Sequence, residues 1–136
     1  MFQGYSSNLA VAANTAFPFN NTVIDKGNAE ALSAPSSIQL NRRGVYLVKV
    51  DGYATGSEAA TGSVQLYANG VAQPQAINEF TLATGETTSF GFNTVIKVTT
   101  NNCPCNAITS PTILQVMNGD TALTDGHINI LITRLC

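Results

Sequence analysis

Charged residues are scarce in this sequence: aspartate, glutamate, lysine and arginine make up 10% of its 136 residues, against roughly 25% in an ordinary soluble domain. Threonine alone outnumbers all the charged residues together, and asparagine equals them. The polar surface is therefore built mainly from hydroxyl and amide groups. Because such a surface carries little like charge, it favours close contact between copies of the same chain.

Features that would point to nucleic acid or membrane are also missing. The formal net charge is -2, and no cluster of lysines and arginines is interleaved with aromatic residues, which disfavours nucleic-acid binding. No apolar run approaches the roughly 20 residues that span a bilayer, so we expect no membrane insertion. Residues 1–13 contain no basic residue ahead of an apolar run, and they therefore do not resemble a secretory signal peptide.

The residue combinations of common catalytic and metal sites are absent as well. His127 is the only histidine, and beside Asp125 it is better explained as a turn residue with a solvated or hydrogen-bonded ring than as a general base. There is neither a nucleophile elbow nor a glycine-rich phosphate loop. Residues 120–125 offer oxygen ligands but lack the spacing and the closing glutamate of a calcium loop. We predict a protein that is not an enzyme and has no cofactor or metal site.

The clearest pattern that is present lies between residues 38 and 54, where a short strand, a turn at 41–44 and a long strand at 45–53 follow one another as a hairpin. Its β-branched and aromatic residues suit a pleated sheet. Alternate side chains point to opposite faces, so Tyr46, Val48 and Val50 give the long strand one wholly apolar face. The opposite face begins apolar and becomes charged, as expected if a second layer or a second subunit covers part of it.

Elsewhere the pattern is also β, with no helical period. Asn69-Gly70 stands between two alternating runs and strongly predicts a β-hairpin, because both turn residues accept positive φ. We expect strands at 9–19, 22–24, 38–40, 45–53, 63–68, 71–82, 86–100, 112–117 and 127–136, and a loop at 27–35 with at most one helical turn. Short strands at this spacing are typical of a two-sheet sandwich or barrel, here as a single domain over residues 1–136.

Several short motifs occur in a familiar order. Phe17-Pro18-Phe19-Asn20 follows a strand of small residues, Gly44-Val45-Tyr46 opens a long strand, the run from Val64 to Gly70 ends in Asn-Gly, and the closing strand is rich in isoleucine. This order resembles the tumour-necrosis-factor and complement-head superfamily of jelly rolls. The sequence around Gln73-Pro74-Gln75, together with a cysteine-bearing loop before residue 112, is also similar to that of small structural proteins of phages and prophages of gut bacteria.

The resemblance implies an antiparallel two-sheet jelly roll that assembles as a homotrimer. In such trimers the sheet with the first, last and long central strands faces the threefold axis, which here means the strands at 9–19, 45–53, 86–100 and 127–136. Leucines on the second face of this sheet agree, because a sheet that faces solvent is polar there. The expected interface residues are Val45, Leu47, Val95, Leu131 and Leu135.

The similarity to phage proteins implies a structural component of the virion surface, such as a capsid decoration or head-fibre protein, made in the cytoplasm of a bacterial host. Other virion proteins would be its partners, and residues 1–7 form a candidate docking arm through Phe2 and Tyr5. The alternative is a module that binds a host-surface protein or glycan through the connections at 55–61 and 71–78. Its candidate contact aromatics are Tyr53, Tyr67 and Phe80.

Three cysteines, Cys103, Cys105 and Cys136, leave several arrangements open. One intrachain disulfide would leave a thiol over, and zinc would need a fourth ligand and a different spacing. In a trimer, Cys136 of one chain could pair with Cys103 or Cys105 of another, or three copies could converge near the axis. Free buried thiols that behave as small apolar residues are equally compatible with the sequence.

Overall fold

The computed structural model describes residues 1–27, 29–56, 58–98 and 112–135. This part of the chain forms ten strands and no helix, and so contains no helix that could cross a membrane. The strands are β1 (Phe2–Val11), β2 (Asn21–Asp25), β3 (Glu30–Ala34), β4 (Ser37–Leu40), β5 (Gly44–Thr55), β6 (Ala60–Ala68), β7 (Val71–Leu82), β8 (Thr87–Val98), β9 (Thr112–Asn118) and β10 (Leu123–Arg134).

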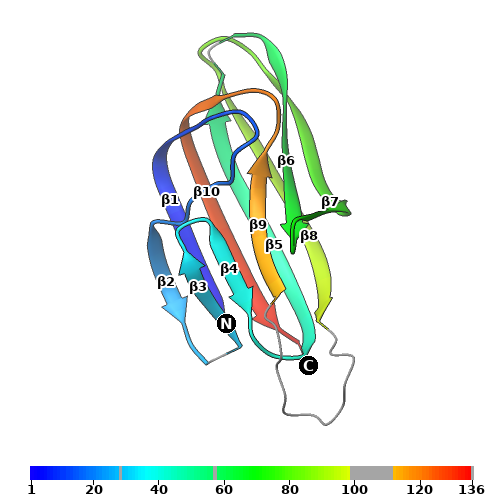
Figure 1. The fold of residues 1–136 in the computed structure, drawn as a ribbon. Coiled ribbons are helices and arrows are strands. Elements are labelled where there is room, and N and C mark those ends of the chain that lie inside the picture. The colour runs from blue at the N-terminus through cyan, green and yellow to red at the C-terminus, as the bar shows by residue number, and fades with distance from the viewer. Residues whose placement is uncertain (28, 57, 99–111, 136) are drawn as a thin grey trace.

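The strands form two five-stranded antiparallel sheets that pack face to face (Figure 1). Sheet A has the order β2-β1-β10-β5-β8, and sheet B has the order β3-β4-β9-β6-β7. The predicted all-β, two-sheet jelly roll is confirmed. The first, last and long central strands lie together in sheet A, as the resemblance implied.

Apolar side chains from the inner faces of both sheets fill the space between them. On β5 these are Tyr46, Val48 and Val50, each at most 1% exposed, which confirms the alternation seen in the sequence. The isoleucines of β10 and aliphatic residues of sheet B complete one continuous core. Because burying a large apolar side chain contributes about 1.5–3 kcal/mol, this core is the main source of the attraction between the sheets.

The predicted hairpin at Asn69-Gly70 is confirmed. The two residues have φ angles of 50° and 77°, and β6 and β7 pair on either side of them. The Asn69 side chain also accepts a hydrogen bond from the Ile113 backbone N at 2.8 Å, on the neighbouring strand β9. The turn is therefore held both by its own conformation and by the sheet beside it.

The hairpin predicted at residues 38–53 is wrong, although both of its strands exist. β4 pairs with β3 and β9 in sheet B, whereas β5 pairs with β10 and β8 in sheet A. Residues 41–43 carry the chain from one sheet to the other. The Tyr46 hydroxyl donates to the Arg42 carbonyl oxygen at 2.5 Å and ties this crossing to the core.

The predicted docking arm at residues 1–7 is also wrong, because Phe2 is not available to contact a partner. These residues begin β1, which pairs with β2 on one side and β10 on the other, and Phe2 is fully buried in the core. The apolar alternation is hidden because Gly4 and Ser6 occupy the next inner positions. Ser6 is buried with its hydroxyl hydrogen-bonded to Pro18 O at 2.8 Å and to Asn20 N at 2.7 Å.

Three further boundaries differ from the prediction. β1 ends at Val11, and residues 12–20 form the connection to β2 instead of a strand at 9–19. β3 occupies Glu30–Ala34, where a loop or helical turn was expected. The segment 71–78 lies within strand β7, so it is not a connecting loop.

Candidate assembly interface on the outer face of sheet A

The outer face of sheet A carries an apolar patch at the end where β10 finishes. Register places Leu47 of β5 directly opposite Val95 of β8, and their side chains are 37% and 51% exposed. Leu131 is half-buried on the adjacent strand β10, opposite Lys49. Directly opposed residues of this kind are in contact across a sheet, so the sequence positions are joined into one surface.

The predicted interface residues all lie on this face. Val45 precedes Leu47 by two positions on β5 and is half-buried, and its carbonyl oxygen accepts from Leu135 N at 2.7 Å. Leu135, just beyond β10, is 55% exposed. The apolar patch is therefore Val45, Leu47, Val95, Leu131 and Leu135. Its role in assembly stays a prediction.

A second group, the tyrosine–histidine cluster of Tyr5, Ser7, Tyr53 and His127, lies at the other end of the same face. The His127 ring stacks on Tyr53, with centroids 5.3 Å apart and an interplanar angle of 14°. The Tyr5 ring lies on the neighbouring strand, 6.0 Å from His127 between centroids. The Ser7 Oγ and His127 Nδ1 atoms are 2.9 Å apart.

Sequence reasoning missed this cluster because its members stand on three different strands. His127 was expected as a turn residue at the start of the closing strand, with a solvated or hydrogen-bonded ring. It lies within β10 opposite Tyr53 of β5, and its ring is hydrogen-bonded to Ser7. The alternation of side chains along each strand could have indicated it. Tyr53 is an even number of residues from Leu47 on β5, and His127 is an even number from Leu131 on β10, so each points to the same outer face. Only the pairing register shows that the outward rings meet.

A polar row separates the apolar patch from the cluster. On β5 the row consists of Lys49 and Asp51, both exposed and of opposite charge. On β1 and β10 it is a side-chain pair in which Gln3 Nε2 donates to Asn129 Oδ1 at 3.1 Å. The face is therefore apolar at one end, aromatic at the other, and nearly neutral throughout.

Within the described residues, this arrangement lacks the parts of a catalytic triad or of a metal site. Among the described residues, no hydrogen bond joins a carboxylate to the His127 ring, so the Ser7–His127 pair lacks the acid that orients the base in a triad. No group of three histidine, cysteine, aspartate or glutamate side chains within the described ranges could hold a metal ion. A broad, open and largely uncharged sheet face is instead typical of contact with another protein surface.

The aromatic residues proposed for glycan contact do not form one site. Tyr53 lies on the outer face of sheet A, whereas Tyr67 is half-buried on the outer face of sheet B, opposite Gln115. Phe80 is 8% exposed and its ring stacks on Phe90 at 5.3 Å in the core, so its predicted contact role is wrong. Cys103, Cys105 and Cys136 lie outside the described residues.

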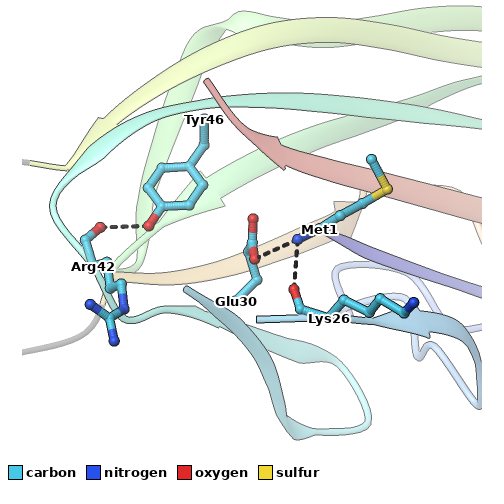
Figure 2. Close-up of polar contacts among 5 residues, drawn as sticks. All are labelled: Met1, Lys26, Glu30, Arg42 and Tyr46. Carbon is cyan, nitrogen blue, oxygen red and sulfur yellow. Dashed lines mark hydrogen bonds and ion pairs between the residues drawn. The ribbon is translucent and has the colours of Figure 1, made fainter. Parts of the chain in front are cut away.

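The Met1 ammonium group and the buried carboxylate of Glu30 fasten the beginning of β1 (Figure 2). The Met1 ammonium group donates to Lys26 O at 2.9 Å and to Glu30 Oε2 at 3.1 Å, and the Glu30 side chain is fully buried. Burial raises the pKa of Tyr46 above its ordinary value, so this hydroxyl stays protonated and keeps its bond to Arg42. These contacts hold the beginning of β1 to the end of β2 and the beginning of β3.

No protein-family model matches the sequence, and no curated protein matches it significantly. Solved structures match along almost its whole length. The globular domain of zebrafish complement 1qA protein gives a TM-score of 0.75 at 8% identity, covering 99% of this chain and 96% of that chain. The vertex protein P5 of PRD1 gives 0.63 at 18% identity, with coverages of 99% and 96%.

Murine APRIL, crystallised at pH 5.0, gives a TM-score of 0.67 at 9% identity and covers 95% of this chain and 96% of that chain. At such identities the likeness establishes the fold and nothing more specific. The chain has the tumour-necrosis-factor-like and complement-head-like jelly roll that its motifs predicted.

Proposed function

We propose that this protein is a non-enzymatic structural component of a phage particle, displayed on the virion surface as a homotrimer that assembles through the outer face of sheet A. The observation that carries the proposal is the apolar patch. Leu47 and Val95 are exposed side by side on two long neighbouring strands. Such a surface is stable in water when another copy covers it.

The energetics favour self-association through this face. Removing the exposed parts of Leu47, Val95 and Leu135 from water contributes about 25 cal/mol per Å² in each copy. The tyrosine–histidine cluster adds rigid aromatic area, which is enriched at the centres of protein interfaces. Lys49 and Asp51 bring opposite charges close together on β5, so that covering them leaves no net charge behind.

The place on a virion rests on similarity and composition. PRD1 vertex protein P5 shares the fold over nearly the whole length of both chains. A surface built from hydroxyl and amide groups suits a protein packed among many copies of virion proteins. A capsid decoration or a head-fibre protein fits both observations, and other virion proteins would then be its partners.

The solution mass of the purified chain tests the assembly. Light scattering at neutral pH should give three times the chain mass of 14.3 kDa. A stable monomer or dimer would contradict the proposed trimer. Repeating the measurement with reductant separates the cysteine alternatives, because only interchain disulfides would make the trimer dissociate under reducing conditions. Binding of the trimer to purified phage particles in a fixed copy number tests the virion role separately.

Recognition of a host glycan is the second candidate, and one feature favours it. On the outer face of sheet B, Tyr67 lies opposite Gln115 and two positions from Gln65, so that an aromatic ring is flanked by amides. Binding sites for small polar ligands combine such groups. A hit on a glycan array that is lost in Tyr67→Ala, with the trimer mass unchanged, would support this function over a purely structural one.

A further inference from the structure

The few charged side chains are separated between the two ends of the sandwich. The end where β1 begins and β10 finishes, here called the basic end, carries Lys26, Arg42, Arg43, Lys97 and Arg134. The opposite end, the acidic end, carries Glu58, Glu79, Glu86, Asp120 and Asp125. Lys49 and Asp51 are a pair of opposite sign in the middle, and the two remaining acidic residues, Asp25 and Glu30, lie at the basic end.

Backbone pairing and one side-chain hydrogen bond bring the basic residues together from four different parts of the chain. Lys26 N donates to Met1 O at 3.0 Å. Arg134 Nη2 donates to Arg43 O at 2.7 Å. Lys97 pairs with Val45, directly after the crossing segment that holds the arginines. All five basic side chains are exposed.

The acidic residues lie on the far connections and strand ends. Glu58 stands between β5 and β6, Glu86 between β7 and β8, and Asp120 between β9 and β10. These three connections share one end of the sandwich, opposite the N-terminus (Figure 1). Glu79 and Asp125 lie on the adjoining parts of β7 and β10, and all five carboxylates are exposed.

The separation gives the molecule a strong charge asymmetry that its net charge of -2 hides. At the basic end the acidic side chains are Asp25 and Glu30, and Glu30 is buried against the Met1 ammonium group. The Lys26 and Arg42 side chains point away from that carboxylate (Figure 2), and both residues are exposed. Lys26, Arg42 and Arg134 line a hollow of about 530 Å³ at this end, together with Met1 and Glu30, which gives a partner a concave surface to enter.

We propose that the basic end is a docking surface for an acidic surface of another protein, with the acidic end directed away from it. Complementary charge of this kind steers and orients a partner. An acidic partner surface would repel the acidic end of this domain, so the domain would dock one way round. The inference goes beyond the proposed function, because it holds for a single chain; parallel copies in a trimer would multiply the contacts.

The partner that fits this end is a protein rather than a nucleic acid. Single-stranded nucleic acids stack on exposed aromatic rings, whereas Phe2 and Tyr46, the aromatic residues nearest the basic side chains, are fully buried. Asp25 and Glu30 also interrupt the positive charge, which disfavours a uniform line of phosphates. A second copy is sign-compatible as well, but head-to-tail contact does not close and would produce open chains of copies.

The test uses the full chain and immobilised poly-L-glutamate as the acidic polypeptide. One variant, Lys26→Gln/Arg42→Gln/Lys97→Gln, removes three charges from the basic end. The matched control, Ala59→Glu/Thr84→Glu/Ala122→Glu, changes three exposed residues, lowers the net charge equally, and leaves the basic end and the outer face of sheet A intact. Binding should weaken about tenfold in the first variant and less than about twofold in the control, and about 0.15 M salt should weaken binding of the natural chain.

Four results would overturn the proposal. These are no binding of the natural chain at low salt, equal weakening in both variants, tighter binding to single-stranded DNA than to poly-L-glutamate, and a concentration-dependent growth in mass that the first variant abolishes. The third result would assign the end to nucleic acid and the fourth to a second copy. Lys26→Gln/Lys97→Gln, which leaves Arg42 and its contacts in place, should weaken binding about fivefold and serves if the triple variant unfolds.

Discussion

The outer faces of the two sheets differ in how their side chains are satisfied. On sheet B the amides bond within the face, as Gln65 Nε2 does to Gln73 O at 3.1 Å and Gln115 Nε2 to Ser37 Oγ at 3.3 Å. On sheet A, Leu47 and Val95 are exposed opposite one another, whereas the exposed apolar residues of sheet B, Val71 and Ile77, lie on its edge strand β7. We therefore expect the central strands of sheet B to face solvent and the outer face of sheet A to be covered by another copy.

The largest effect is expected when two lysines are placed on the outer face of sheet A. Leu47→Lys/Val95→Lys should reduce the assembly to single chains, because each buried and unpaired lysine costs about 3–5 kcal/mol in a close interface. Light scattering measures the mass, and circular dichroism shows whether the chain remains folded.

The matched control for that variant adds the same two charges to sheet B. Gln65→Lys/Gln115→Lys should leave the mass unchanged, because these positions lie on the face that already bonds within itself. A control that dissociates while the sheet A variant stays assembled would reverse the assignment of the two faces.

The two sheets also differ in how well they tolerate a larger residue at a glycine of an inner strand. A Cβ atom added at Gly52 of sheet A would overlap the His127 backbone oxygen, whereas one added at Gly62 of sheet B would lie 2.5 Å from the Phe80 ring. A side-chain ring can shift more easily than a paired strand. Gly52→Ala should therefore cost about 3 kcal/mol or more of unfolding free energy, and Gly62→Ala about 1–2 kcal/mol; a urea titration of both variants would refute this order if Gly62→Ala cost more.

The tyrosine–histidine cluster allows a smaller and more local test. Tyr53→Ala should weaken assembly by about 1–2 kcal/mol, roughly tenfold in the association constant, since an interface aromatic is lost. Tyr67→Ala removes the corresponding aromatic from sheet B and should leave the association constant unchanged. Sedimentation equilibrium over a dilution series measures both association constants. Equal weakening in the two variants would contradict the prediction, because it would not be specific to the outer face of sheet A.

The same contrast explains which parts of the fold the sequence could predict. Strands whose inner positions are apolar, such as β5 with Tyr46, Val48 and Val50, could be predicted with their faces. The start of β1 could not, because Gly4 and Ser6 occupy inner positions and Ser6 is satisfied by a segment twelve to fourteen residues away. β3 was not predicted for a similar reason, because its first inward residue is the charged Glu30, which is buried.

The candidate interface divides in the same way. Its apolar patch could be predicted because an apolar residue on an outward parity is visible in a single strand, as Leu47 is on β5. The tyrosine–histidine cluster could not, because Tyr5, Tyr53 and His127 come from three strands, and a shift of one residue in either register would send a ring to the opposite face. Long-range register is set by packing, which local pattern does not contain.

The smallest predicted effect concerns the inner face of β5 and the contribution of Tyr46 to stability. Tyr46 points inward from β5 beside the outward Leu47, and its hydroxyl bonds to Arg42 O. Because burial raises the pKa of Tyr46 in the folded state above the ordinary value of 10.0, the folded chain holds this proton more tightly than the unfolded chain does. The stabilising contribution is therefore complete below pH 10 and declines as the pH rises through the folded-state pKa.

Tyr46→Phe should remove that alkaline decline and cost about 1 kcal/mol of unfolding free energy at neutral pH, the net value of one hydrogen bond. It should leave the assembled mass unchanged, since the ring lies on the core side of sheet A. Urea titrations at neutral and alkaline pH, read beside light scattering, measure both properties. A Tyr46→Phe chain that kept its stability but lost its assembly would mean that the two faces of β5 are coupled, and that the outer face of sheet A is shaped by the crossing at Arg42 as well as by its own exposed side chains.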